Sequence, residues 1–380
     1  MKRVLLALAL CALTAQAQQG ALFDRVAEVL AKRYYDPDFR TDKLPKLIES
    51  FRAQAHAART PAEERAVIFD FLAKCPTSHL TLLSEVGARI AQSELRGHTA
   101  LTFGIQLTQL SGGDYFVHRV VFGGPAHAAG LLRGDRIVAI DGLAPGDSPR
   151  LDWRSDDAHL PDTPKHALLV DEPVLLRVER KRGEAFDVTL APVPWSSLKA
   201  DRASMRVIER SGLRLGYLHL SYMYDRESSG LLVEALHGPL KGCDGLVLDL
   251  RGRGGSPRAV QRVTQALCGG DPVYDGPLVV LLDRDTRSAK EALAWELRER
   301  GRAELVGEKT AGAVRPGQFL RITEDAYLFM PVPSKFVYTR LLELKGVEPD
   351  VKAADPLPYA AGADPILEAG LRTLLTLIPV

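Results

Sequence analysis

Residues 21–75 contain two segments, 22–30 and 61–72, in which apolar side chains recur every three or four positions. This spacing places the apolar side chains on one face of a helix. The residues Tyr-Asp-Pro-Asp at 35–38 separate the two segments and are typical of a turn. The pattern therefore predicts an N-terminal helical segment, which we bound at residues 18–97.

The pattern changes near residue 98, where short runs of alternating apolar and polar residues begin. Residues 102–107 indicate an edge strand after a tight turn, and residues 116–121 indicate a second strand. A short helix of small residues is expected at 125–132, and residues 174–190 predict a hairpin. Residues 98–194 are therefore predicted to form a β-domain.

From about residue 195 the chain alternates between apolar runs and helical patterns. The runs 245–250 and 277–282 are continuously apolar, which is typical of parallel strands buried on both faces. Helical patterns follow them, at 257–267 and from Ser288. Residues 195–380 therefore predict an α/β core, and the whole chain a multidomain α/β (α+β) protein. The other elements expected in the core are a strand at 213–221, a helix at 228–240, a strand at 303–308 and hairpins within 319–338.

Composition and charge narrow the class of protein. A chain of 380 residues is expected to form two or three domains, and 46% hydrophobic with 26% charged residues is typical of a folded soluble protein. The net charge of +1 provides no basic surface, so we expect no nucleic-acid partner. Residues 1–17 combine Met-Lys-Arg, an apolar run and Ala-Gln-Ala, which is the pattern of a cleaved signal peptide. The apolar run is too short for a permanent anchor, so the mature chain is expected to be secreted or periplasmic and not membrane-spanning.

Three cysteines, Cys75, Cys243 and Cys268, remain once residues 1–17 are removed. Their spacing matches no metal site, and we expect neither a metal nor an organic cofactor. Cys243 precedes the predicted strand 245–250, and Cys268 ends the helix that follows this strand. These two ends of a βα unit lie on the same side of a sheet, so an oxidising compartment favours a Cys243–Cys268 disulfide over two independent thiols.

Ser288 is the first candidate for chemistry. It opens a predicted helix soon after a buried strand. The helix dipole and the free N–H groups of the first helical turn stabilise negative charge, which suits a nucleophilic serine. Serine is also a favoured helix cap, so the position alone leaves a purely structural role open.

Residues 124–142, with the sequence GPAHAAGLLRGDRIVAIDG, closely resemble part of a PDZ domain. In PDZ domains a loop of the Phe-Gly-Ile type binds the terminal carboxylate of a peptide, which adds to the sheet as a strand. The resemblance implies that Phe103, Gly104 and Ile105 bind the free C-terminus of a polypeptide substrate, with the helix at 125–132 as the other wall of the groove. The alternative is a PDZ module that only packs against its neighbours.

The order of signal peptide, helical segment, PDZ domain and α/β core resembles the C-terminal processing (tail-specific) serine peptidases over nearly all of the mature chain. This resemblance implies a core of the ClpP/crotonase-like type and a serine-type endopeptidase that cleaves polypeptides through an acyl-enzyme. It makes Ser288 the nucleophile, and the backbone N–H groups of Gly255 and Ala289 the oxyanion hole. The motifs that carry it are DLRGRGG at 249–255, SAKE at 288–291, GRAELVGEKTAG at 301–312 and GVEPD at 346–350.

Two positions depart from the family pattern. Ala313 stands where the family has its lysine base, and Arg253 stands where an asparagine is usual. Without a base, a serine hydroxyl is a poor nucleophile. The family resemblance by itself therefore leaves Ser288 without its activating partner.

A second resemblance supplies a different base. Thr77-Ser78-His79 resembles the Thr-Ser-His of tricorn-type peptidases, in which that histidine is the base. Those enzymes place a glutamate three residues before the Gly-Val-x-Pro-Asp motif, and in this chain that residue is Glu343. Histidine titrates near neutral pH, and a carboxylate can fix its tautomer. The resemblance therefore implies a catalytic site of Ser288, His79 and Glu343.

Several alternatives stay open. His79 is also compatible with a capping or solvated residue at a helix end, and Glu343 with a surface partner of Lys345. Lys290 is a rival base, although positions i and i+2 face different sides of a helix. The rival functions are therefore a catalytically inactive PDZ-containing binding protein and a peptidase with a Ser288–Lys290 dyad. The physiological substrate and the oligomeric state stay open at this point.

Overall fold

The computed structural model describes residues 20–153 and 165–379, which form two compact units. The first unit contains residues 20–88 and Arg315–Lys335, and the second unit contains the rest. The predicted signal peptide lies outside the described residues. In the described part of the chain, no helix is long and apolar enough to cross a membrane. Each unit is built from more than one stretch of chain. The predicted regions 18–97, 98–194 and 195–380 stay a prediction.

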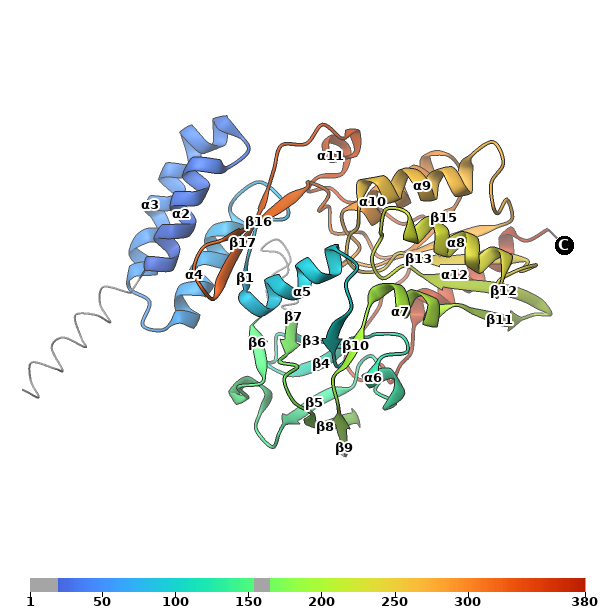
Figure 1. The fold of residues 1–380 in the computed structure, drawn as a ribbon, viewed down its shortest axis with the longest axis horizontal. Coiled ribbons are helices and arrows are strands. Elements are labelled where there is room, and N and C mark those ends of the chain that lie inside the picture. The colour runs from blue at the N-terminus through green and yellow to red at the C-terminus, as the bar shows by residue number, and fades with distance from the viewer. Residues whose placement is uncertain (1–19, 154–164, 380) are drawn as a thin grey trace, which may run out of the picture. The chain divides into compact units, whose positions relative to one another are not determined.

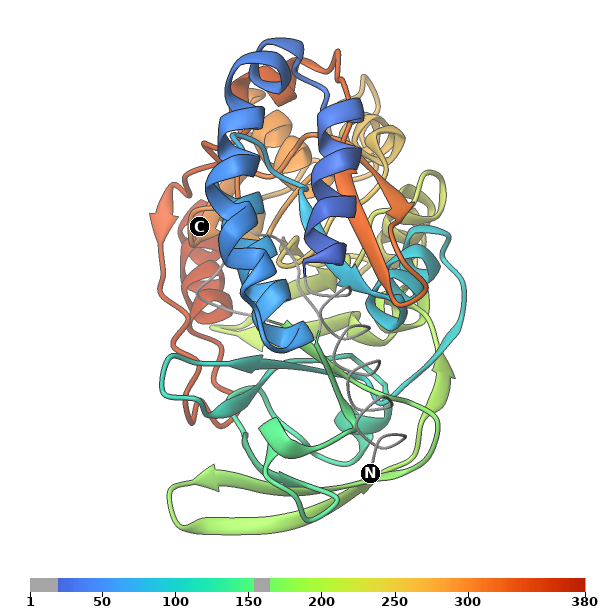
Figure 2. The same cartoon turned by 90° about the vertical axis from the view of Figure 1, so that its left-hand side faces the viewer.

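Three helices around a shared apolar core form most of the first unit. They are α2 (Ala21–Arg33), α3 (Leu44–His56) and α4 (Pro61–Ala73), with a π-helical turn η1 (Phe39–Lys43) after α2. Their ribbons are the blue ones in Figures 1 and 2. The rings of Phe23 and Phe71 meet edge to face with centroids 5.2 Å apart, which fastens α2 to α4. Thr60 caps α4 by accepting the Glu63 N–H at 3.2 Å, and Pro61 occupies the first helical position, where no N–H is needed.

An antiparallel sheet completes the first unit. Its strands are β1 (Thr81–Ser84), β17 (Ala326–Pro331) and β16 (Gly317–Arg321), in this spatial order. Thr81 pairs with Phe329, so the sheet joins segments that are far apart in the sequence. The hairpins expected within 319–338 extend only to Pro331, because a helix of the second unit, α11 (Val337–Leu342), takes up the end of that range.

A seven-stranded antiparallel sheet forms the β-domain of the second unit. Its strands, in spatial order, are β6 (Leu151–Trp153), β7 (Lys165–Leu168), β3 (Ile105–Gln109), β4 (Tyr115–Val120), β5 (Arg136–Ile140), β8 (Val174–Lys181) and β9 (Glu184–Leu190). A separate pair joins β2 (Ala100–Thr102) to β10 (Val193–Trp195), and the short helices are α6 (Pro125–Ala128) and η2 (Pro145–Asp147). The hairpin predicted at 174–190 corresponds to β8 and β9.

Two details of the β-domain differ from the sequence prediction. The strand predicted over 102–107 is broken at Gly104, which has a left-handed φ of 70°. The part after the break is β3, which is an interior strand and not an edge strand, because it pairs with β4 on one side and β7 on the other. The helix predicted over 125–132 ends after one turn, and Gly130 follows it with a φ of 75°.

A six-stranded sheet forms the core of the second unit. Its strands, in spatial order, are β11 (Arg206–Arg210), β12 (Leu213–His219), β13 (Gly245–Asp249), β14 (Leu278–Leu282), β15 (Glu304–Gly307) and β18 (Val351–Lys352). The last five of these strands, β12, β13, β14, β15 and β18, run parallel to one another, and β11 is an antiparallel edge strand. The two continuous apolar runs of the sequence correspond to β13 and β14, which lie at the centre of this sheet.

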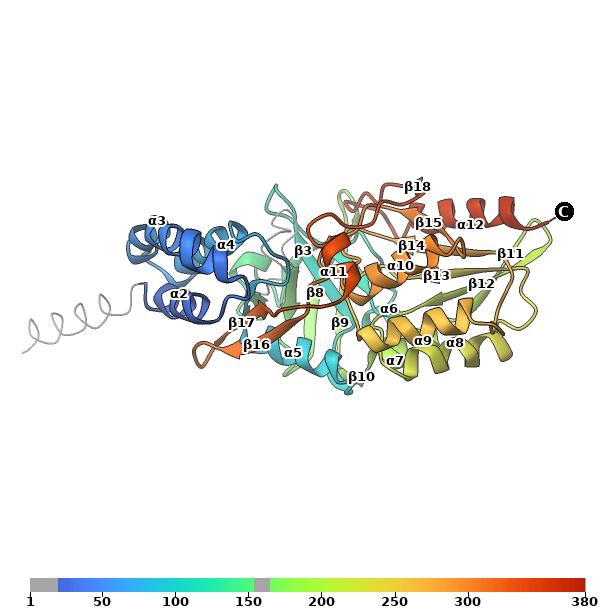
Figure 3. The same cartoon turned by 90° about the horizontal axis from the view of Figure 1, so that it is seen from above.

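Helices cover both faces of the core sheet. They are α7 (Ser197–Ser204), α8 (Glu227–His237), α9 (Pro257–Cys268), α10 (Ala289–Glu299) and α12 (Pro365–Leu377). Helix α5 (Glu85–Leu95) begins in the first unit and ends in the second. Figure 3 shows α8, α9 and α10 on one side of the sheet and α12 on the other. Leu246 and Leu248 pack with the first group of helices, and Val247 packs with α12. Alternate residues of one strand are thus buried on opposite faces, which is why the run is apolar throughout.

The expected disulfide between Cys243 and Cys268 is absent from the described structure, where both residues are free thiols. Cys243 lies against Gly216 of β12, whereas Cys268 lies near Arg302, beyond the end of α10. The prediction of a disulfide was wrong, because both thiols pack against the same apolar core cluster without forming a bridge. Burial raises the pKa of both thiols and raises that of the buried Cys75 to about 12, so all three favour the protonated form.

Candidate active site

Ser288 lies in the turn between β14 and α10, at the carboxyl end of the parallel strands. Its φ of 60° and ψ of −126° form a conformation that residues with a side chain rarely adopt. Other serines that begin helices in this chain are extended, with φ −136° and ψ 158° at Ser196 and φ −79° and ψ 136° at Ser256. Capping therefore does not account for the conformation of Ser288. Such strain occurs at functional turns, including the strand-to-helix turn that presents a nucleophilic serine.

Glu291 holds this turn, a role that the sequence reasoning missed. Its side chain is fully buried in the first turn of α10. One carboxylate oxygen accepts hydrogen bonds from the Thr310 hydroxyl at 2.5 Å and the Gly312 N–H at 2.7 Å. The other accepts from the Ala313 N–H at 2.8 Å and the Ser288 N–H at 3.1 Å. Burial raises the pKa of Glu291 to about 7, and these hydrogen bonds oppose that shift.

A glycine turn after β13 lies beside Ser288. A Cβ atom at Gly254 would lie 3.7 Å from the Ser288 Cβ, which is an ordinary contact distance. Gly255 forms a parallel bridge with Met223, made by the Met223 N–H to the Gly254 carbonyl at 3.2 Å and by the Ser256 N–H to the Met223 carbonyl at 2.8 Å. A Cβ atom at Gly255 would lie only 2.4 Å from the Met223 Cβ, so this position requires glycine. The bridge leaves the N–H of Gly255 itself on the opposite side.

Ala289 is the first residue of α10, and its N–H has no acceptor within the helix. The two predicted oxyanion donors, the N–H groups of Gly255 and Ala289, therefore belong to two turns that meet at Ser288. The positive end of the α10 dipole raises the electrostatic potential at Ser288, which favours negative charge there. An oxyanion hole requires backbone donors of this kind, already in place before charge develops.

Ala313 contributes to the site only through its backbone. Its side chain is buried, and its carbonyl accepts the Ser288 N–H at 2.8 Å. Glu343 directly follows α11, and its Oε2 atom accepts the N–H of Val314 at 3.2 Å. The structure therefore brings the predicted supporting carboxylate to the residue next to Ala313, so that one loop contacts both Glu343 and Ser288.

His79 belongs to the first unit, whereas Ser288 belongs to the second. It lies just before β1 and has a left-handed φ of 55°. Its Nδ1 atom is 3.1 Å from the Ser78 hydroxyl oxygen, and its ring centroid is 5.6 Å from that of Phe329. Thr77 and Ser78 are buried. The pairing of His79 with Ser288 stays a prediction.

Lys290, the rival base, is fully buried. Its ammonium group donates hydrogen bonds to the Ser221 carbonyl at 3.0 Å and the Arg251 carbonyl at 2.9 Å. Burial lowers the pKa of Lys290. In the described structure its hydrogen bonds therefore go to two backbone carbonyls and not to the hydroxyl of Ser288.

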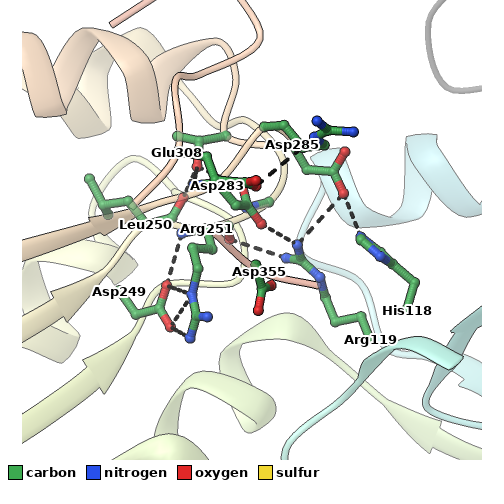
Figure 4. A network of polar contacts seen from close by, with 12 residues as sticks. His118, Arg119, Asp249, Leu250, Arg251, Asp283, Asp285, Glu308 and Asp355 are labelled. Atoms are coloured by element: carbon green, nitrogen blue, oxygen red, sulfur yellow. Dashed lines mark hydrogen bonds and ion pairs between the residues drawn. The ribbon is translucent and has the colours of Figure 1, made fainter. Parts of the chain in front are cut away.

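Charged residues connect β4 of the β-domain to the turns that flank the site, as Figure 4 shows. His118 Nε2 lies 2.6 Å from Asp285 Oδ2. Arg119 donates to Asp283 Oδ2 at 2.9 Å and to the Arg251 carbonyl at 3.2 Å. Asp283 and Asp285 lie in the turn that leads to Ser288, and Arg251 lies in the turn that leads to the glycines. The sequence reasoning did not find these contacts, because the partners lie in different predicted domains.

A buried ion pair anchors the start of the glycine turn. The Arg251 guanidinium donates to Asp249 Oδ2 at 2.7 Å and to Asp364 Oδ2 at 2.7 Å (Figure 4 shows the pair with Asp249). Burial alone would raise the pKa of Asp249, but Arg251 outweighs it and holds this pKa well below its ordinary value.

No group of three or more His, Cys, Asp or Glu side chains within residues 20–153 and 165–379 is arranged to hold a metal ion.

Phe103, Gly104 and Ile105 form the bend between β2 and β3. Phe103 is buried in the apolar core of the β-domain. The Gly104 N–H donates to the Thr102 hydroxyl at 2.9 Å, and Ile105 pairs with Val120 of β4. Part of the backbone predicted to bind a carboxylate is therefore satisfied within the domain, and peptide binding here stays a prediction.

Residues 258–353, which include Ser288 and Glu343, match the family model of peptidase family S41. The chain contains a peptidase family S41 domain. The carboxyl-terminal-processing protease of a Picosynechococcus species is 28% identical over 221 residues, which are 50% of this chain and 48% of that protein. The chloroplastic C-terminal processing peptidase of Tetradesmus obliquus is 28% identical over 345 residues, which are 79% of this chain and 70% of that protein. The chain thus spans only about half the length of the first of these relatives.

Solved structures share the fold of this chain. The photosystem II D1 C-terminal processing protease matches with a TM-score of 0.50 and 21% identity, over 94% of this chain and 97% of that chain. The tricorn protease matches with a TM-score of 0.52 and 16% identity, over 95% of this chain and 37% of that chain. The mixed α/β architecture of this chain is therefore shared with these two protease structures. The family model that matches residues 258–353 and these sequence relatives are all those of peptidases.

Proposed function

We propose that the chain is a secreted or periplasmic serine-type endopeptidase of the tail-processing kind. The hydroxyl of Ser288 attacks the scissile carbonyl, and the N–H groups of Gly255 and Ala289 stabilise the oxyanion. His79, supported by Glu343, takes the serine proton and passes it to the leaving amine. Water then attacks the acyl-enzyme, with His79 as base again, and releases the carboxylic acid from Ser288.

The conformation of Ser288 is the observation that carries the proposal. A left-handed serine costs about 1–3 kcal/mol and persists only where its surroundings hold it. Glu291 supplies that hold by accepting the Ser288 N–H from its buried position. Ser196 and Ser256 start their helices without any such strain. The strained serine also lies at the start of a helix and beside a glycine turn, where backbone donors are available for an oxyanion.

A fluorophosphonate probe tests this proposal, because it forms a covalent bond with an activated serine. We expect the probe to label residues 18–380 at Ser288, and we expect Ser288→Ala to lose both labelling and peptide hydrolysis. Ser196→Ala is the matched control, since Ser196 caps α7 in the ordinary extended conformation, and it should label like the wild type. A wild-type chain that stays unlabelled, or hydrolysis that survives Ser288→Ala, contradicts the proposal.

A catalytically inactive peptide-binding protein is the second candidate function, and Ala313 is the observation that favours it. The position at which the family has its base holds a buried, non-titratable side chain. In that case the probe leaves Ser288 unmodified while polypeptides still bind. A Ser288–Lys290 dyad has less support, because the Lys290 ammonium is bonded to the Ser221 and Arg251 carbonyls.

We further propose that the β-domain selects polypeptide substrates through their free C-termini. The support is the PDZ-like sequence at 124–142 and the left-handed bend at Gly104 before β3. The structure adds a condition, because β7 already pairs with β3 at Leu107 and Thr108. A peptide that adds as a strand at these residues must displace β7, so binding of a C-terminus and release of β7 are coupled in this proposal.

A further inference from the structure

Lys290 is a buried charge that the proposed mechanism does not use. Its side chain has no exposed surface, although lysine is almost never fully buried unless it is paired. Desolvation of an ammonium group is costly, and burial accordingly lowers the pKa of Lys290. A fully buried lysine two residues after the proposed nucleophile therefore requires an explanation.

Two segments of backbone hold the ammonium group, and the charges of Arg119, Asp201, Asp249 and Asp283 act on it. Lys290 donates to the Ser221 carbonyl at 3.0 Å and the Arg251 carbonyl at 2.9 Å. Asp201 on α7 is also fully buried; its Oδ1 atom accepts the Ser221 N–H at 2.7 Å, and its charge attracts Lys290. Both backbone groups of Ser221 are therefore held, the N–H by Asp201 and the carbonyl by Lys290.

The two segments that Lys290 holds meet beside the proposed nucleophile. The segment after β12 leads to Met223, and the segment after β13 leads to Gly255. These two residues form the parallel bridge of the glycine turn, and a Cβ atom at Gly254 in that turn would lie 3.7 Å from the Ser288 Cβ. One ammonium group thus ties the start of α10 to both sides of the bridge that carries a proposed oxyanion donor.

We propose that Lys290 is a positioning residue that sets the separation between the two oxyanion donors, the N–H groups of Gly255 and Ala289. Ala289 adjoins Lys290 on α10, and Gly255 is held through the Ser221 and Arg251 carbonyls. A displacement of about 1 Å in such a site costs on the order of a hundredfold in rate. The inference rests on the proposed function, because it assumes that an oxyanion forms at this site.

Steady-state hydrolysis of a fluorescence-quenched peptide that the wild type cleaves tests this role. Lys290→Met keeps the length of the side chain and removes both hydrogen bonds, and we expect it to lower kcat at least tenfold while KM stays within threefold. Lys290→Gln keeps two N–H donors but has no basic group, and it should recover at least threefold in kcat over Lys290→Met. Lys309→Met is the control and should leave kcat unchanged, because Lys309 is exposed and pairs only with the exposed Glu348.

Three results overturn the inference. The first is an unchanged kcat in Lys290→Met. The second is a loss in Lys290→Gln as complete as that of Ser288→Ala, which would identify Lys290 as a base. The third is a fall in activity that only follows the folded fraction measured by circular dichroism.

Two further variants keep the test decisive. If Lys290→Met does not fold, Asp201→Asn replaces it, because this change keeps an acceptor for the Ser221 N–H and removes the charge that faces Lys290. We then expect kcat to fall at least threefold at constant KM, and an unchanged kcat overturns the inference. Hydrolysis that survives Ser288→Ala contradicts the proposed function itself, and the inference then falls with it.

Discussion

Thr310→Val tests whether the Ser288 turn is held through Glu291. Thr310 is buried, and its hydroxyl donates to Glu291 Oε1 at 2.5 Å and accepts the Val347 N–H at 2.7 Å. Valine has nearly the same shape but can neither donate nor accept a hydrogen bond. The substitution therefore removes two buried hydrogen bonds without opening a cavity.

The expected loss of stability follows from these two contacts. A hydrogen bond to a charged group contributes about 1.5–3 kcal/mol, and an unpaired buried N–H costs about 1–3 kcal/mol. We therefore expect Thr310→Val to lower the free energy of unfolding by roughly 3–5 kcal/mol. Glu291 also loses one of its four donors, so the turn it holds should relax, and the rate at which a fluorophosphonate labels Ser288 should fall at least about tenfold.

Urea denaturation measures the first quantity, and labelling kinetics measure the second. Thr310→Ser keeps the hydroxyl, so it should lose no more than about 1 kcal/mol for the missing methyl group. Thr376→Val should change neither quantity, because Thr376 is exposed and bonds only to the Thr373 carbonyl of its own helix. If Thr310→Val and Thr310→Ser behave alike in both measurements, the hydroxyl does not support the Ser288 turn and the reasoning is wrong.

Three other predictions test the site and its surroundings. His79→Ala should lower peptide hydrolysis at least about a hundredfold, as expected for a general base, and activity that survives the change contradicts the proposed triad. Burial lowers the pKa of His219 from 6.5 to about 4, so stability present above pH 6.5 should be lost as the pH falls to 4, by roughly 3 kcal/mol in urea denaturation. His219→Gln should remove that part of the pH dependence, and identical profiles would refute it. Peptides that end in an apolar residue with a free carboxylate should bind the protein several-fold more tightly than the same peptides with an amidated end. Equal affinities in fluorescence anisotropy would show that the loop at Gly104 does not bind the terminal carboxylate.

The central strands could be predicted from the sequence because burial on both faces demands an uninterrupted apolar run. Leu246 and Leu248 pack against the helices on one face of the sheet, and Val247 packs against α12 on the other face. A strand with one face in solvent would alternate between apolar and polar residues. The position of Ser288 could be predicted for a related reason, since a turn after such a strand lies at the carboxyl end of the sheet. Its backbone conformation could not, because serine is compatible with an ordinary cap at the same place.

Long-range contacts account for what the sequence did not reveal. The pairing of Thr81 with Phe329 depends on residues that are distant in the chain, and neither segment has a local pattern that selects the other. The role of Glu291 depends likewise on the N–H groups of Gly312 and Ala313, although the Ser-x-x-Glu spacing of a capping box was visible. The burial of Lys290 was equally hidden, because its two carbonyl partners come from the ends of other strands.

The exchange of the family lysine for Ala313 is compatible with an intact nucleophile, because this position holds Ser288 through the backbone alone. The Ala313 N–H donates to Glu291, and its carbonyl accepts the Ser288 N–H. A change of side chain there removes a base without releasing the strained turn. That strain is large beside a total stability of about 5–15 kcal/mol, and a protein that no longer used Ser288 would gain stability by relaxing it. We therefore propose that the base is supplied from elsewhere in the chain, and His79 is the titratable residue that we propose for this role.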